Sequence, residues 1–179
     1  MKGEIEPYNS FGNGSAMRVS PVGGYARSLN EAERIAKLTA EITHDHPEGI
    51  KGAQAIAGAI WLAKSGVSKA EIKAYVQAEY GYDPDISLDA LRKKEYVWDE
   101  TCQTTVPIAI KCFLESIDFE DTVKTAVSVG GDSDTIAAIA GSIAEAYFGI
   151  GASLIAQAKN YLDDKLLGVA ERFTDTFLK

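Results

Sequence analysis

Two carboxylates and a hydroxyl stand close together in residues 130–135, which read GGDSDT. Hard divalent cations such as Mg²⁺ prefer oxygen ligands, and Asp132, Asp134 and Thr135 would supply three of them from one turn of chain. Alternatively, Asp132 caps a helix, and the charge of Asp134 interacts favourably with the positive N-terminal end of that helix. These contacts would stabilise the helix by roughly 1 kcal/mol. The segment behind the motif is nearly uncharged, so it predicts a central helix. Buried carboxylates there are costly unless something positive compensates them, which favours a bound cation.

A second group of chemically useful residues lies in the run SFGNGSAMR at 10–18. Its Gly-Asn-Gly core is an adaptable loop whose backbone amides can turn towards an anion, and Asn13 can both donate and accept hydrogen bonds. Phe11 could stack on a ring. Two plainer interpretations stay open: Gly-Asn-Gly is a simple turn, and Arg18 pairs with one of the abundant acids.

The two histidines of the chain, His44 and His46, flank Asp45. An H-x-H pair can bind zinc or copper, but no cysteine or third histidine stands nearby to complete such a site. We therefore expect His44 to face a polar ligand and His46 to lie at the surface or cap a helix. Glu48 follows closely, yet nothing in the pattern places it or Asp45 at a reacting atom.

Helical patterns are expected to position these residues. Residues 1–30 are rich in Gly, Ser, Asn and Pro, which predicts an ordered loop. No β-alternation persists, so we predict one all-α domain over residues 1–179, a compact bundle of seven to nine helices with 136–146 the most buried. The expected helices cover about 30–43, 49–64, 68–80, 101–116, 118–129 and 133–147, with a short one inside 83–100 and one or two in 151–179.

Composition narrows the class of protein. Hydrophobic residues make up 46% and charged residues 25%, and the net charge is −8, which argues against a nucleic-acid binder. The apolar runs are shorter than the ~20 residues of a membrane span, and the start has no signal-peptide core. Cys102 and Cys112 are not spaced as metal ligands, and we expect reduced core thiols in a cytoplasmic protein.

Four blocks of sequence resemble the ADP-ribosylglycohydrolase family in the same order. The most specific is the last one; the blocks read SFGNGSAMRVSPVG, THDHPEGIKGAQAIAGAI, TCQTTVPIAIKCFLES and FEDTVKTAVSVGGDSDTIAAIAGSIAEAYFG. The resemblance implies an all-helical fold that cleaves the N- or O-glycosidic bond between ADP-ribose and a modified side chain or a related small molecule. It also implies a binuclear Mg²⁺ centre.

The resemblance carries over to individual residues. It implies that Asp132, Asp134 and Thr135 bind the metal, Mg²⁺ or Mn²⁺. It also implies that His44 lies near the ribose or phosphates. The residues implied to lie along the ADP-ribose are Ser10, Phe11, Gly12, Asn13 and Gly14. Some members carry an acid at the position of Ser10, so this chain is similar to the branch that carries serine there.

The chain departs from the family pattern upstream of Ser10. Family members have a Gly-Asp-Ala-Gly-Pro-Glu type segment and a Thr-Asp-Asp segment before the Gly-Asn-Gly loop, and neither stands here. The resemblance implies that those segments supply the remaining metal ligands and the catalytic acid. The sequence therefore predicts the C-terminal half of the fold, with weak metal binding and no catalytic residue that we can name.

Three hypotheses about function follow. The chain is a hydrolase that works with a complementary N-terminal chain, an inactive binder of ADP-ribose or a nucleotide, or a stable structural remnant. The expected ligand is ADP-ribose or an ADP-ribosylated substrate. We also expect a homo-oligomer, because the face left by the other half would be apolar.

Overall fold

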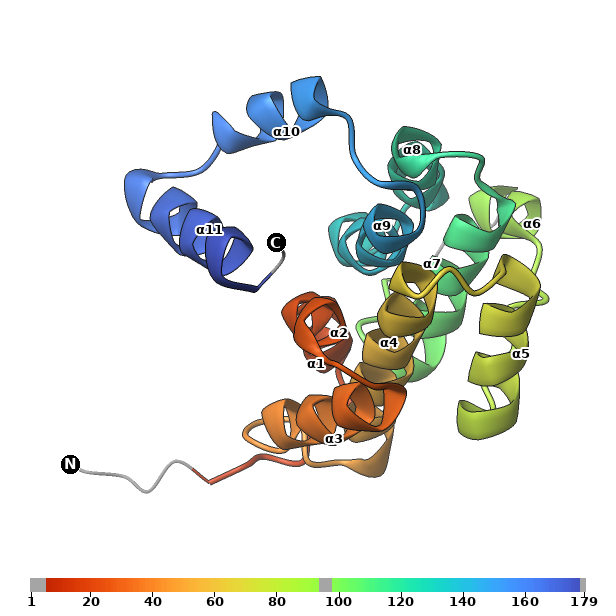
Figure 1. Cartoon of the computed structure of the whole chain (residues 1–179). Helices are drawn as coiled ribbons and strands as arrows, with labels where there is room; N and C mark the ends of the chain where they lie inside the picture. Colours follow the sequence, from red (N-terminus) through yellow and green to blue (C-terminus); the bar gives the residue numbers. More distant parts are fainter. Residues whose placement is uncertain (1–5, 94–97, 178–179) are drawn as a thin grey trace.

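A computed structural model describes residues 6–93 and 98–177 (Figure 1). Within these ranges the chain forms helices and no strand, and the predicted all-α fold is confirmed. The remaining residues, 1–5, 94–97 and 178–179, belong to the predicted N-terminal loop, polar segment and tail and lie outside the described residues. The helices are α1 (Gly14–Met17), α2 (Ser20–Tyr25), α3 (Leu29–Ala40), α4 (Pro47–Lys64), α5 (Lys69–Tyr80), α6 (Leu88–Lys93), α7 (Cys102–Glu115), α8 (Phe119–Val129), α9 (Ser133–Phe148), α10 (Ala152–Lys159) and α11 (Asp164–Phe177).

The prediction of a loop over residues 1–30 holds for 6–13 but was wrong for much of 14–30, and the count of seven to nine helices was wrong too. Two short helices, α1 and α2, lie in that segment and bring the described total to eleven. Pro21 stands in the first turn of α2, where its missing N–H costs nothing. A Cβ on Gly23 would come within 2.7 Å of the Ile60 side chain on α4, so the glycine permits close contact. Packing on α4 therefore overrides the weak helical propensity of these residues.

Local signals set several helix ends as predicted. Ser68 and Glu71 form a reciprocal capping box at the start of α5, and Gly81 ends that helix with φ of 65°. Asp118 caps α8 by accepting a hydrogen bond from the Asp121 amide. These caps stabilise the helix ends because they satisfy backbone groups that would otherwise lack partners.

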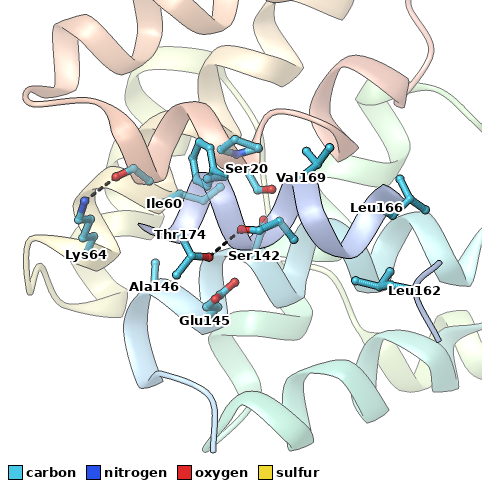
Figure 2. Close-up of a pocket in the computed structure, with 14 residues that line it drawn as sticks. Ser20, Ile60, Lys64, Ser142, Glu145, Ala146, Leu162, Leu166, Val169 and Thr174 are labelled. Atoms are coloured by element: carbon cyan, nitrogen blue, oxygen red, sulfur yellow. Dashed lines mark hydrogen bonds between the residues drawn. The ribbon is translucent and has the colours of Figure 1, made fainter. Parts of the chain in front are cut away.

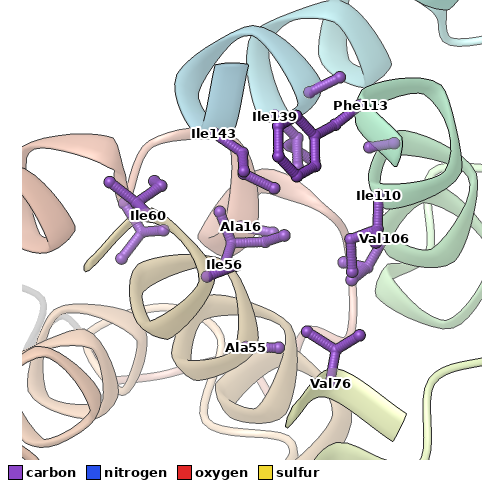
Figure 3. Packing of buried hydrophobic residues seen from close by; sticks show 14 of the residues in the cluster. Ala16, Ala55, Ile56, Ile60, Val76, Val106, Ile110, Phe113, Ile139 and Ile143 are labelled. Atoms are coloured by element: carbon purple, nitrogen blue, oxygen red, sulfur yellow. The ribbon is translucent and has the colours of Figure 1, made fainter. Parts of the chain in front are cut away.

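The centre of the bundle is α4, which packs against α1, α2, α3, α5, α7 and α9. Ten of its residues are buried, against seven in α9, so the prediction that 136–146 would be the most buried helix was wrong. Many of the buried residues in α4 are glycine or alanine, which let neighbouring helices approach closely. Larger side chains from α4, α7 and α9, among them Ile56, Phe113 and Ile139, fill the space between the helices (Figure 3).

A partly buried polar cluster ties α3, α4 and α5 together. The hydroxyls of Tyr75 and Tyr80 both donate to Oε1 of Glu33, at 2.7 and 2.9 Å. Tyr75 lies against the backbone of α4 at Gly58, where an added Cβ would come within 1.8 Å of its hydroxyl oxygen. The glycine therefore makes room for the tyrosine that anchors α5 to α3.

A lysine joins three helices at the other side of the bundle. The Lys69 ammonium donates to the carbonyls of Leu114 and Ser116 at the end of α7. It also lies 5.0 Å from the ring centre of Phe113 and 4.9 Å from that of Phe148. Burial lowers the pKa of Lys69 below its ordinary value. The carbonyl dipoles and aromatic faces offset the cost of holding a cation there.

Among the described helices, none is both long and apolar enough to cross a membrane. The two cysteines, Cys102 and Cys112, are free and buried, as expected. The last two helices, α10 and α11, differ from the rest because neither has a buried residue. In Figure 1 they form an arm that follows α9 and lies apart from the α4 core.

Replacing Gly58 with alanine should destabilise the protein. The added methyl would displace Tyr75 from Glu33, so we expect the free energy of unfolding to fall by about 2 kcal/mol. Gly141→Ala is the matched control, because a Cβ there meets Val123 at an ordinary 3.5 Å. That variant should stay as stable or gain up to about 1 kcal/mol. Urea unfolding followed by circular dichroism measures both, and equal stabilities would contradict the role of Gly58.

Candidate functional site

The side-chain amide of Asn13 joins two parts of the chain that are 119 residues apart. Its Nδ2 donates to Oδ2 of Asp132 at 2.5 Å and to Oγ1 of Thr105 at 2.9 Å. All three side chains are buried, with exposed fractions of 6%, 4% and 0%. The Gly-Asn-Gly loop and the Asp132 motif therefore form one cluster, supported from beneath by α7.

The first turn of α9 holds the other oxygen groups of the motif. Gly130 and Gly131 adopt φ of 81° and 62°, which most side chains avoid, and turn the chain from α8 into α9. Asp132 makes no side-chain capping hydrogen bond, so the capping alternative does not describe it. Among the described residues, the Thr135 hydroxyl has only the Met17 sulfur as a side-chain partner, at 3.6 Å. Asp134 is exposed and makes no hydrogen bond or ion pair within the described ranges.

These groups fit one side of a site for a hard cation. Asp132, Asp134 and Thr135 provide oxygens that the helix itself does not use. No cluster of three or more His, Cys, Asp or Glu residues suited to a metal occurs in residues 6–93 and 98–177. The donor set is therefore compatible with Mg²⁺ but supplies only part of the usual coordination shell.

The backbone of the loop pairs with the start of α7. The Asn13 amide donates to the Glu100 carbonyl at 2.6 Å, and the Cys102 amide donates to the Phe11 carbonyl at 3.0 Å. The Cys102 thiol also donates to the Gly12 carbonyl at 3.2 Å. Burial raises the pKa of this thiol to about 11, so it stays protonated and able to donate at neutral pH. These contacts fix the loop in place.

His44 lies against the same loop, next to Gly12 and Gly14. Its Nε2 would be 3.0 Å from a Cβ added to Gly14, so a larger residue there would require the imidazole to shift. Its Nδ1 lies 2.7 Å from the Thr43 hydroxyl, which in turn accepts a hydrogen bond from Arg18 at 2.8 Å. Burial, and then the charge of Arg18, lower the pKa of His44 below its ordinary value. A neutral His44 is therefore favoured at pH 7.

The other predicted residues of the site take separate positions. His46 caps α4 by accepting a hydrogen bond from the Glu48 amide, so it is engaged as a cap and not in an H-x-H metal pair with His44. Phe11 is 46% exposed, and its ring and that of His46 form a T-shaped pair with centres 5.4 Å apart. Ser10 accepts a hydrogen bond from the Gly12 amide at 3.1 Å.

The acids near His44 are occupied by other contacts. Asp45 accepts a hydrogen bond from the Asn9 amide at 2.7 Å. Glu48 pairs with Lys51 at 2.8 Å. Neither carboxylate hydrogen-bonds to the loop, so the geometry gives no candidate for a catalytic acid among them. Arg18 donates to Thr39 and Thr43 and has no ion pair with an acid among the described residues, contrary to the plainer interpretation.

Sequence patterns missed four residues that shape the site: Thr43, Thr105, Cys102 and Met17. Their side chains contact His44, Asn13, Gly12 and Thr135 respectively. Thr105 had one usable signal, since it is a hydroxyl on the otherwise apolar buried face of a predicted helix. A buried hydroxyl needs a partner, and here that partner is Asn13.

Residues 2–178 match the model of the ADP-ribosylglycohydrolase family. The chain belongs to this family. Human ADP-ribosylhydrolase ARH3 is 29% identical over an alignment of 187 residues, which covers 79% of this chain and 51% of the human protein. ADP-ribosylarginine hydrolase Tri1 of Pseudomonas putida is 28% identical, covering 83% of this chain and 41% of that one.

Structural similarity agrees with the family. A solved structure of an ADP-ribosylglycohydrolase-related protein complex has a TM-score of 0.65 and 25% sequence identity. The match covers 82% of this chain and 53% of the solved one. The chain thus spans about half the length of the curated relatives it matches.

Asn13→Ala should destabilise the cluster. Removing the amide leaves the buried Asp132 carboxylate without its donor, which costs about 1–3 kcal/mol in the free energy of unfolding. Thr105→Val removes only one of the two contacts made by Asn13 and should cost less, about 1 kcal/mol. Denaturant unfolding of both variants tests whether the loss of unfolding free energy is larger in Asn13→Ala than in Thr105→Val. A Thr105→Val loss larger than that of Asn13→Ala would show that Asp132 does not depend on Asn13.

His44 should make stability depend on pH on the acid side. The pKa of His44 is lowered in the folded state. The unfolded chain, in which the His44 pKa is about 6.5, therefore binds more protons than the folded chain below that pH. Stability is full above that value and falls as the pH drops towards the folded pKa. His44→Gln should flatten this slope, and Arg18→Gln should reduce it partly. Unfolding free energies between pH 5 and 8 measure the effect; an unchanged slope in His44→Gln would refute it.

Proposed function

We propose that this chain takes part in hydrolysis of the glycosidic bond of ADP-ribosylated molecules, contributing half of a Mg²⁺ site and part of an ADP-ribose pocket. The observation that carries the proposal is the hydrogen bond from Asn13 to Asp132. It puts the expected ligand loop beside the expected metal motif. Family membership and the names of the relatives support the reaction class.

In this proposal each predicted residue has a separate role. Asp132, Asp134 and Thr135 would hold the metal, which, when bound, supplies positive charge that orients ribose hydroxyls. The backbone amide of Gly14 would bind a phosphate, with His44 beside it and Phe11 against a ring. Ser10 and Asn13 would hold the loop and its ligand in place.

We propose further that turnover needs more than these residues. The described part of the chain offers no third metal-binding acid beside Asp132, and no acid free to act on the bond near His44. A complementary segment, on the same or another polypeptide, would supply both. The free buried thiols support a cytoplasmic location, where thiols stay reduced.

Binding of ADP-ribose without turnover is the second candidate function. The incomplete set of metal-binding acids favours this candidate. Hydrogen bonds hold the loop beside His44 in place, whereas the described residues supply only part of a metal site. The two candidates differ in one measurable respect. Only the first predicts release of ADP-ribose once the complementary half is present.

Calorimetry tests the shared part of both candidates. We expect ADP-ribose to bind the chain, and Mg²⁺ to bind weakly because half the usual ligands are missing. Asp134→Asn should remove the heat of Mg²⁺ binding, since that side chain makes no hydrogen bond or ion pair with the described residues that the substitution could break. Asp89→Asn on α6, an exposed acid paired with Arg92, is the control and should leave the heat unchanged. Equal heats from wild type and Asp134→Asn would refute the metal site.

An activity assay separates the two candidates. We expect the chain alone not to release ADP-ribose from ADP-ribosylated protein with Mg²⁺ present. Adding a complementary N-terminal half should produce Mg²⁺-dependent release that Asp132→Ala abolishes. Metal-dependent release by the chain alone, absent in Asp132→Ala, would show that the indispensable residues were misjudged.

A further inference from the structure

One nitrogen of the His44 ring faces the ligand loop without a partner. A Cβ added to Gly14 would lie 3.0 Å from Nε2, and one added to Gly12 would lie 3.6 Å from it. His44 is only 7% exposed, yet its Nε2 makes no hydrogen bond with residues 6–93 or 98–177. A nearly buried ring therefore directs an unpaired polar atom at the Gly-Asn-Gly loop.

The other nitrogen of the ring contacts a hydroxyl that is already an acceptor. Nδ1 of His44 lies 2.7 Å from Oγ1 of Thr43, and the same oxygen accepts a hydrogen bond from Arg18 at 2.8 Å. A guanidinium has only donors, so Thr43 keeps its own hydroxyl proton for a different partner. Within the described part of the chain, Nδ1 of His44 is the partner that this proton reaches.

The charge of Arg18 favours this direction of the hydrogen bond. If Nδ1 carried the proton, two donors would meet at one oxygen, and the positive end of the N–H dipole would point towards the guanidinium. In the order Arg18 to Thr43 to His44, the cation instead polarises the hydroxyl and strengthens the bond that it donates. Arg18 is held for this role by the Thr39 carbonyl, in the last turn of α3, where the helix dipole favours a cation.

The proton of the neutral ring then lies on the nitrogen that faces the loop. Burial, and then the charge of Arg18, lower the pKa of His44, so the ring is neutral at pH 7. A neutral imidazole has one donor nitrogen and one acceptor nitrogen. Because Nδ1 accepts from Thr43, Nε2 is the donor.

A cavity elsewhere in the protein does not offer comparable donors. It has a volume of about 570 Å³ and lies between α9, which contributes Ser142 and Glu145, and α11, which contributes Val169 (Figure 2). Its lining is mostly apolar and includes no residue of the Gly-Asn-Gly loop. A diphosphate needs hydrogen-bond donors when it leaves water, so that lining does not suit it. On the loop side, Nε2 of His44 lies beside the Gly14 amide proposed above to bind a phosphate.

We propose that Arg18 and Thr43 are positioning residues that hold His44 in the Nε2–H tautomer, so that this N–H donates to a phosphate oxygen of the ligand at the Gly-Asn-Gly loop. In this role both residues act through His44. The identity of the ligand, ADP-ribose, rests on the function proposed above. The tautomer does not, because it follows from contacts within the chain.

Proton–nitrogen NMR correlations of the imidazole rings in the ligand-free full chain measure the tautomer directly. At about pH 8, where histidine is neutral, we expect the wild-type His44 to carry its proton on Nε2. Thr43→Val removes the donor to Nδ1 and should raise the share of the Nδ1–H tautomer about fivefold, the factor expected for one lost neutral hydrogen bond. Arg18→Met should raise it by a smaller factor. Thr43→Ser keeps the hydroxyl and should behave as the wild type.

Two controls separate this effect from a general disturbance of the fold. Thr39→Val removes a neighbouring hydroxyl that donates to the Ala36 carbonyl, and it should leave the His44 tautomer unchanged. His46, whose Nδ1 accepts from the Glu48 amide, should keep its signals in every variant. The His44→Gln spectrum assigns the two rings.

Calorimetry with ADP-ribose tests the consequence for the ligand. Thr43→Val should bind about fivefold more weakly than the wild type, and Thr43→Ser should bind equally well. A wild-type His44 protonated on Nδ1, or an unaltered tautomer in either Thr43→Val or Arg18→Met, would overturn the proposal. So would a Thr43→Ser variant that shifts the tautomer as Thr43→Val does. If the wild type bound no ADP-ribose, the function proposed above would fail, and the NMR result alone would decide the roles of Arg18 and Thr43.

Discussion

A carboxylate held away from water at the start of α9 governs the arrangement of the site. Asp132 is buried, and it accepts a hydrogen bond from the side-chain amide of Asn13, which reaches it from the loop before α1. Burying a charge costs much unless it is paired or hydrogen-bonded. The loop, α7 and α9 must therefore meet at one point, and this requirement sets how α7 packs against α9 and where the chain crosses between them.

The helices that carry their own signals were predictable from sequence, and those formed by packing were not. The capping box at Ser68 and the cap at Asp118 act within one turn, so they can be read locally. In contrast, α1 and α2 consist of residues with little helical preference and form against the small side chains of α4. Likewise α9 is the more apolar sequence, yet α4 is more buried because its glycines and alanines admit more neighbours.

The candidate site shows the same division. Motifs around Asn13 and Asp132 were visible because unusual residue types cluster within a few positions. Their direct contact was not, since hydrogen bonds between side chains 119 residues apart leave no local pattern. The supporting groups, Thr105 and Cys102, look like ordinary members of a buried helix face. Sequence thus identifies residues able to do chemistry more readily than those that hold them in position.

The Cys102 thiol beneath the loop can report on the opening of that loop. Cys102 is fully buried, and its pKa of about 11 leaves almost no thiolate at neutral pH. While its sulfur donates to the Gly12 carbonyl, oxidants and alkylating reagents have little to react with. Reaction at this cysteine requires the loop to lift from α7. The rate of thiol labelling therefore measures how often the ligand loop opens, and a ligand that holds the loop down would slow it.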